Sequence, residues 1–227
     1  MNYLAHFVFN HQVCGLPADP YFALGVVLPD LWARYSRRKR LRWRAVRAAL
    51  PADAIDAALQ AGLLNHVEVD RRFHTLPLFA QWQAATRAAH NGNGAHPAVL
   101  DFVAHMAVEL ALDHHLLRAK VGLADRLYDL LAMCDPELAA ERAGRLGAVD
   151  AGGLGPIIRS FVGRRYMHGY VRRDGLVEAI GLVLTAAEIP VPQADALHAY
   201  LGCALELVDP ARLWAELGPI GPLARPT

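Results

Sequence analysis

Two stretches of the sequence place histidines and carboxylates four residues apart in apolar surroundings. The stretches read NHVEVDRRFHTL and VAHMAVELALDHH, and their polar positions are His66, Asp70 and His74 in the first and His105, Glu109 and Asp113 in the second. Positions i, i+4 and i+8 share one face of an α-helix, with a drift of about 40° per step. Each stretch therefore predicts a helix that carries a stripe of imidazole and carboxylate groups.

Such stripes are chemically suited to a metal ion. Burying an unpaired carboxylate costs several kcal/mol, so a stripe on an otherwise apolar helix must meet cations, hydrogen-bond donors or water. A divalent ion satisfies several groups at once, and mixed nitrogen and oxygen ligands suit Mn, Fe, Zn or Mg. Asp30, at the end of the run ALGVVLPD, is a further candidate ligand. His6, in NYLAHFVF, is by itself more typical of a core histidine.

Helices are the elements expected to hold these groups. The chain has 227 residues, 54% of them hydrophobic, with many alanines and leucines and few alternating β-branched runs. This pattern predicts an all-α fold, a single multi-helix domain over residues 1–217 and a frayed tail at 218–227. Loops are expected at 90–97 and 150–156, where glycine is frequent. The predicted helices are 2–12, 20–34, 40–49, 51–64, 66–89 with a kink at Pro77, 98–119, 123–133, 136–146, 157–169, 173–188, 193–207 and 209–217.

The cellular compartment is predicted from three negative features of the sequence. No apolar run reaches the ~18 residues of a membrane span. The start, MNYLAHFVFNHQ, lacks the basic region and cleavage site of a signal peptide. The three cysteines are isolated, which is typical of a reducing compartment. We therefore expect a cytoplasmic protein without a transmembrane segment.

A basic cluster lies near the N-terminus of this almost neutral chain. Residues 1–50 carry eight basic side chains against only two acidic ones, although the net charge of the whole chain is +1. Such a cluster can steer an acidic partner, and the alternative is a solvated basic surface. Nothing else in the sequence indicates nucleic-acid binding. The candidate partner-binding residues, spaced as on one helix face, are Arg37, Arg40, Arg44 and Arg47.

Four motifs in order resemble the acyl carrier protein phosphodiesterases, distant relatives of the HD-domain metal phosphohydrolases. The motifs are MNYLAH at the start, GVVLPD at 25–30, GLLNHVEVDRRFHTLP at 62–77 and HMAVELALDHHL at 105–116. The resemblance implies an HD-like helical bundle and a divalent metal, typically manganese. It also implies hydrolysis of the phosphodiester that joins phosphopantetheine to a carrier-protein serine, and an acidic carrier protein as partner of the basic cluster.

The resemblance also assigns roles to particular residues. Asp30 matches the N-terminal acidic residue of the family, and Asp113-His114 matches its adjacent Asp-His pair. The family's His-Arg-Arg-x-Asp reads here as Asp70-Arg71-Arg72-Phe73-His74, with the end residues exchanged, and its later Ser-Arg-Arg is absent. His66 and His105 are the candidate proton acceptors or orienting residues. The predicted metal ligands are Asp30, Asp70, His74, Glu109, Asp113 and His114.

Three other readings of the function remain open at this point. Related helical scaffolds support other phosphohydrolases and di-iron enzymes. A non-enzymatic scaffold, whose stripes form buried hydrogen-bond networks, is the second alternative. Binding to a lipid surface through the tryptophan-containing basic stretch 32–47 is a third reading.

Overall fold

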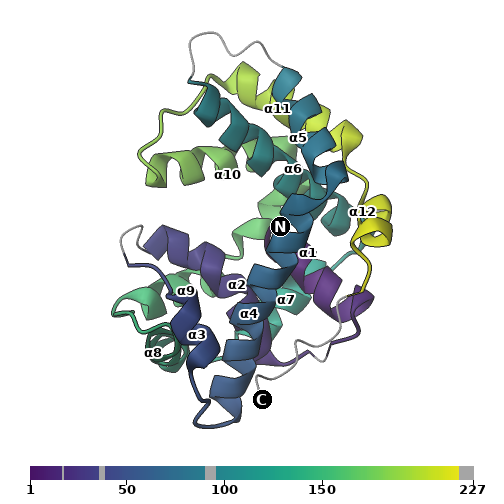
Figure 1. Ribbon diagram of the computed structural model, residues 1–227. Coiled ribbons are helices and arrows are strands. Elements are labelled where there is room, and N and C mark those ends of the chain that lie inside the picture. The colour runs from purple at the N-terminus through teal and green to yellow at the C-terminus, as the bar shows by residue number, and fades with distance from the viewer. Residues whose placement is uncertain (17, 36–38, 90–95, 220–227) are drawn as a thin grey trace. The chain divides into compact units, whose positions relative to one another are not determined.

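The computed structural model describes residues 1–16, 18–35, 39–89 and 96–219, and helices are the only regular elements in those ranges. The all-α prediction is confirmed. The helices, labelled in Figure 1, are α1 (Tyr3–Val8), π-helical η1 (Phe9–Val13), α2 (Pro20–Tyr35), α3 (Trp43–Ala48), α4 (Ala54–Thr75), α5 (Pro77–Ala88), α6 (Pro97–Ala119), α7 (Leu123–Leu131), α8 (Pro136–Leu146), α9 (Leu154–Arg164), 3₁₀-helical η2 (Tyr166–Val171), α10 (Arg173–Ala186), α11 (Ala194–Leu207) and α12 (Pro210–Leu217).

The chain divides into two compact units, each assembled from separate stretches. Unit 1 comprises Met1–Ala5, Arg72–Leu123 and Tyr166–Gly218, and unit 2 comprises His6–Arg71 and Ala124–Arg165 with Pro219. The single HD-like domain over 1–217 stays a prediction. Residues 220–227 of the predicted tail 218–227 and residues 90–95 of the predicted loop 90–97 lie outside the described residues.

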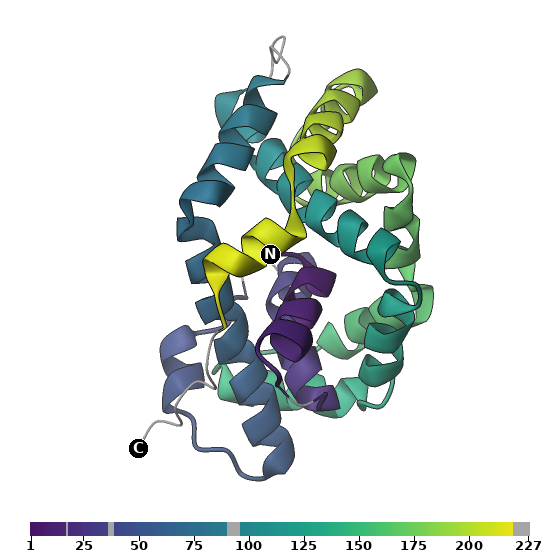
Figure 2. The same ribbon diagram turned by 90° about the vertical axis from the view of Figure 1, so that its right-hand side faces the viewer.

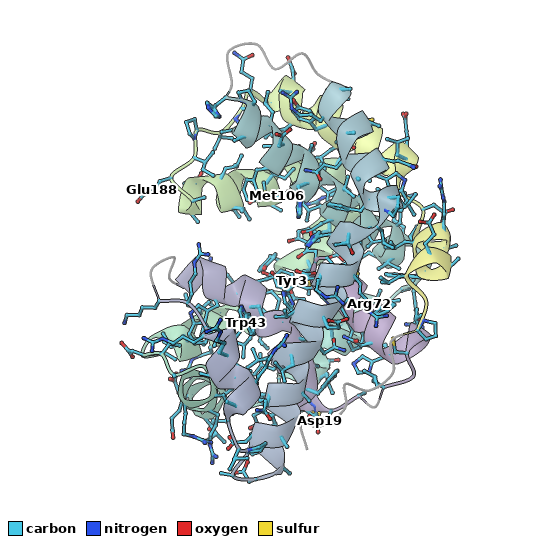
Figure 3. All side chains as sticks on the ribbon, viewed as in Figure 1. Tyr3, Asp19, Trp43, Arg72, Met106 and Glu188 are labelled. Carbon is cyan, nitrogen blue, oxygen red and sulfur yellow. The ribbon has the colours of Figure 1, made fainter. Side chains whose placement is uncertain are left out.

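Unit 1 is built around α6. This helix is apolar on almost every side, and thirteen of its residues are buried, Asp113 and His114 among them. Figures 1 and 2 show α5 and α11 beside it, and η2 and α10 also pack against it. Figure 3 labels Met106, one of the buried residues of α6. Because the other faces are filled with apolar side chains, the polar stripe of α6 is held in a fixed direction.

In unit 2, two glycines allow close packing of α2 against α4. A Cβ atom at Gly62 would overlap the carbonyl oxygen of Phe22, and one at Gly25 would overlap the carbonyl oxygen of Leu59. The two backbones therefore approach to a distance that only glycine permits. Elsewhere in this unit, α9 packs against both α8 and α2. The close approach of α2 and α4 matters for the site, because one helix carries Asp30 and the other carries His66.

Several helix boundaries differ from the sequence predictions. The predicted loop at 150–156 ends early because α9 begins at Leu154, and the predicted helix 157–169 ends at Arg164 because Arg165 is left-handed (φ 45°). Helix α4 continues through residue 65, where a break was expected, because neither glycine nor proline interrupts it there. The predicted kinked helix at 66–89 is instead two helices, since Leu76 precedes a proline and adopts extended angles (φ −67°, ψ 133°). The predicted helix 40–49 begins only at Trp43, labelled in Figure 3, because Arg42 is extended and its N–H bonds the Gly147 carbonyl.

Within the part of the chain that the structure describes, no helix is both long enough and apolar enough to cross a membrane.

Candidate metal centre

Three donor side chains meet in unit 2 and are called here the His66 group: His6, His66 and Asp70. One ligand atom from each lies within 4.8 Å of those of the other two. The two oxygens of Asp70 face different imidazoles, with Oδ1 3.1 Å from Nε2 of His6 and Oδ2 3.4 Å from Nε2 of His66. Both rings thus direct the same kind of nitrogen at one carboxylate, as ligands of a shared ion would.

The orientation of His66 is fixed by helix α2. Its Nδ1 lies 2.8 Å from the carbonyl oxygen of Val26. A carbonyl can only accept a hydrogen bond, so Nδ1 carries a proton, and Nε2 is the ring nitrogen that faces the carboxylates. Asp30, one helical turn beyond Val26, places Oδ1 3.8 Å from the same Nε2. A backbone carbonyl behind the ring is the usual support of a metal-ligating histidine.

His6 is held less completely than His66. Its ring stacks on that of His66 with centroids 4.5 Å apart and an interplanar angle of 25°. Its Nδ1 is buried without a hydrogen-bond partner among the described residues. The position of His6 therefore depends on Asp70 and on the stacked ring.

Burial and charge set the protonation of the His66 group. Burial lowers the pKa of His6, and the neighbouring His66 lowers it further. Burial by itself opposes the charged form of Asp70, but nearby positive charge and the hydrogen bond to His6 hold the pKa of this carboxyl below its ordinary value. A neutral imidazole beside an ionised carboxylate is the state that binds a cation.

A second set of donors lies in unit 1 and is called here the His74 group: His74, His105 and Glu109. Nε2 of His74 and Nε2 of His105 each lie 3.1 Å from Oε1 of Glu109. The α-amino nitrogen of Met1 lies 2.8 Å from the same oxygen. Burial opposes ionisation of Glu109, but the positive charge of the Met1 α-amino group and the hydrogen bonds from the two histidines hold its pKa well below the ordinary value. Three nitrogens thus surround one ionised oxygen.

The other two predicted ligands on α6 face backbone atoms. Oδ1 of Asp113 accepts a hydrogen bond of 2.9 Å from the N–H of Ala5, and Oδ2 accepts one from the N–H of Leu4. Complete burial nevertheless raises the pKa of Asp113 to about 8. Nδ1 of His114 lies 2.7 Å from the Tyr170 carbonyl oxygen. The part that either residue plays in metal binding stays a prediction.

The basic cluster does not form the continuous helix face that its spacing predicts. Arg44 and Arg47 lie on α3 and are exposed, whereas Arg40 precedes that helix. Arg37 lies outside the described residues. Arg42, which was not among the candidates, is exposed directly before α3. The exposed basic surface that the structure describes therefore includes Arg40, Arg42, Arg44 and Arg47.

Sequence reasoning found most of the donors but not their grouping. The stripe of α4 supplies His66 and Asp70 to one group and His74 to the other. His6 was read as a core residue, yet it belongs to the His66 group. In the sequence, His6 stands out as a histidine inside an apolar helix, but core histidines show the same pattern. Only the fold brings it to Asp70.

Compared with known proteins, the chain matches no family model, no curated protein and no solved structure.

Proposed function

We propose that this protein is a divalent-metal-dependent phosphodiester hydrolase whose metal is held by the His66 group together with Asp30. The observation that carries the proposal is the pair of imidazole nitrogens directed at the two oxygens of Asp70, with one of the rings backed by the Val26 carbonyl. A hydrogen-bonded core pair needs one histidine and one carboxylate. Here two imidazoles face the carboxylate of Asp70, and a second carboxylate, that of Asp30, lies 3.8 Å from Nε2 of His66, which together offer a ligand set for an ion.

The chemistry of the donors indicates the kind of ion. Two carboxylates and two imidazoles make a mixed set of oxygen and nitrogen ligands. Such a set suits a comparatively hard transition-metal ion, and manganese is our first choice. A bound divalent ion would supply a water of lowered pKa and would polarise a phosphoryl oxygen. Asp30 is the most exposed member of the set at 35%, against 24% for Asp70 and 6% for His66. Asp30 is therefore the member of the set most accessible to water.

The substrate class is proposed from the motif resemblance and from charge. The resemblance points to the phosphodiester between phosphopantetheine and a carrier-protein serine. Arg42, Arg44 and Arg47 are exposed and contribute a local positive charge, to which an acidic carrier protein is complementary. Manganese, the phosphodiester and the acidic partner are thus one consistent proposal, and each part can be tested separately.

The test combines metal analysis with a phosphodiesterase assay. Protein purified without chelator is analysed for Mn, Fe, Zn and Mg, and then incubated with holo acyl carrier protein while free phosphopantetheine is measured by mass spectrometry. We expect the purified protein to contain bound metal. Release of phosphopantetheine should stop when chelator is added and return when Mn²⁺ is added. The rate of release should fall at least ~100-fold in His66→Gln and in Asp70→Asn.

The matched control is His11→Gln. The Nδ1 of His11 bonds the Leu16 carbonyl, and His11 belongs to neither donor group. This variant should keep its metal and its rate. If the protein binds no metal and is equally stable with and without chelator, the non-enzymatic scaffold replaces the hydrolase as the interpretation. Metal binding with no hydrolysis of any phosphodiester would leave the metal centre but remove the proposed reaction.

A further inference from the structure

We infer that the His74 group is a second divalent-metal site, of the nitrogen-rich kind that Zn²⁺ prefers, with ligands other than those of the centre proposed above. Its ligands are Nε2 of His74, Nε2 of His105 and the carboxylate of Glu109. Two histidines with one glutamate is a ligand set that zinc uses in proteins, with further positions left for water.

The distances within the His74 group fit an ion. Ligand atoms about 2.1 Å from a tetrahedral zinc stand about 3.4 Å from one another. The two observed separations between an imidazole nitrogen and Oε1 of Glu109 are both 3.1 Å. All three ligand atoms lie within 4.8 Å of one another, so modest side-chain rotation would complete the coordination.

The imidazole rings are positioned by aromatic packing. The ring of Phe79, on α5, lies edge-on to His74 and to His105, with centroids 5.1 Å apart in both cases. Phe79 and Phe73 are buried and pack on each other at 4.6 Å. His74 comes from the last turn of α4, and His105 and Glu109 lie one turn apart on α6. The site is therefore built on helices and is held by buried rings, rather than assembled from mobile surface side chains.

Hydrogen bonds and a metal ion would use the same ligand atoms in different protonation states. Without a metal, both imidazoles must present an N–H to the same oxygen of Glu109, which also faces the α-amino group of Met1. An ion would take the place of the two imidazole protons and would use the lone pairs instead. Because His74 and His105 are 31% and 29% exposed, water can reach the ion and occupy the remaining positions.

The experiment is a Zn²⁺ titration of the full chain after removal of metals with chelator, followed by calorimetry. Co²⁺ serves as a second probe, because its visible absorption reports a tetrahedral nitrogen-containing site. We expect wild-type protein to bind an ion that His66→Gln still binds with unchanged affinity. His74→Gln and His105→Gln should each weaken this binding by at least ~100-fold and abolish the Co²⁺ absorption.

The matched control on α6 is His115→Gln, whose Nε2 bonds the Leu205 carbonyl outside the His74 group. This variant should titrate as the wild type does, and circular dichroism should show equal helix content in all four variants. Unchanged Zn²⁺ affinity in both His74→Gln and His105→Gln would overturn the inference, as would loss of all binding in His66→Gln. Neither result depends on hydrolysis, so failure of the proposed reaction would leave the inference intact.

Discussion

The two donor groups use the same residue types but differ in how their histidines are supported and exposed. In the His66 group the imidazoles are 1% and 6% exposed, and a backbone carbonyl fixes the proton of His66. In the His74 group both imidazoles are about one-third exposed, and the edge of Phe79 holds them. The first arrangement fixes a tautomer, whereas the second fixes only ring direction. We therefore expect tighter binding and slower exchange of metal in the His66 group.

A substitution at the close approach of α2 and α4 should produce the largest difference between the two donor groups. A side chain in Gly62→Val would overlap the Phe22 carbonyl and would stand near the Val26 nitrogen, so the helices must separate. We expect the free energy of unfolding to fall by ~3 kcal/mol. Mn²⁺ binding by the His66 group should be lost, while Zn²⁺ binding by the His74 group persists. Urea denaturation and metal titration measure these effects.

The control for this substitution is Gly181→Ala on α10. A Cβ at Gly181 meets no atom within 4 Å, so alanine should leave stability unchanged or raise it by up to ~1 kcal/mol. A Gly62→Val protein as stable as the wild type would show that α2 and α4 do not pack as described.

Replacing one histidine of each group by alanine should show how much more the buried histidine contributes to stability than the exposed one. In the presence of chelator, His66→Ala removes a buried ring and its hydrogen bond to Val26, and we expect a loss of ~2 kcal/mol. His74→Ala removes a partly exposed ring and should cost less than ~1 kcal/mol. Equal losses in urea denaturation would contradict the proposed difference in support.

Asp113 lies one turn beyond Glu109 on α6. Its contribution to the free energy of unfolding should change with pH in the opposite direction to that of Glu109. Its pKa is raised to about 8 by burial in the folded chain, against about 3.9 in the unfolded chain. The folded state therefore binds the extra proton between these values. Its contribution to stability is complete below pH ~4 and declines as the pH rises through 8, by at most about 1.4 kcal/mol per pH unit.

The variant Asp113→Asn should accordingly flatten the decrease in unfolding free energy between pH 5 and pH 9, as measured by urea denaturation at each pH. Asp101→Asn, on the exposed side of the same helix beside Arg87, is the control and should retain the wild-type slope. An identical pH profile for Asp113→Asn and wild type would mean that Asp113 is ionised in the folded protein.

The smallest effect is expected from the basic surface, which lies outside both groups. Replacing Arg42 and Arg44 by Glu should change the free energy of unfolding by no more than ~0.5 kcal/mol, because both side chains are exposed. Metal affinity at either group should be unchanged. Hydrolysis of acidic carrier protein should slow at low salt, while hydrolysis of a small phosphodiester should not. Equal rates on carrier protein would remove the basic surface from the proposal.

Much of the site was predictable because helical spacing is local. The i, i+4 stripes of α4 and α6 follow directly from the sequence, and so does the all-α fold, since alanine, leucine and periodic apolar positions favour helices. The effect of Pro77 on the chain at Leu76 was also predictable, although the proline separates two helices instead of kinking one.

The pairing of the stripes was not predictable from local spacing. His66 and His74 share a helix face in the sequence, yet one meets His6 and Asp70, and the other meets His105 and Glu109. His6 and Asp70 are 64 residues apart, and their contact depends on how helices pack.

The sequence by itself determined the helices and the residue types on each helix face, because both depend on interactions within a few residues. Only the tertiary structure decided which imidazole faces which carboxylate, which ring a carbonyl supports and which carboxyl is buried beside backbone amides. The physical reason is that metal ligands must lie within a few ångströms of one another, and contacts between distant segments set distances on that scale.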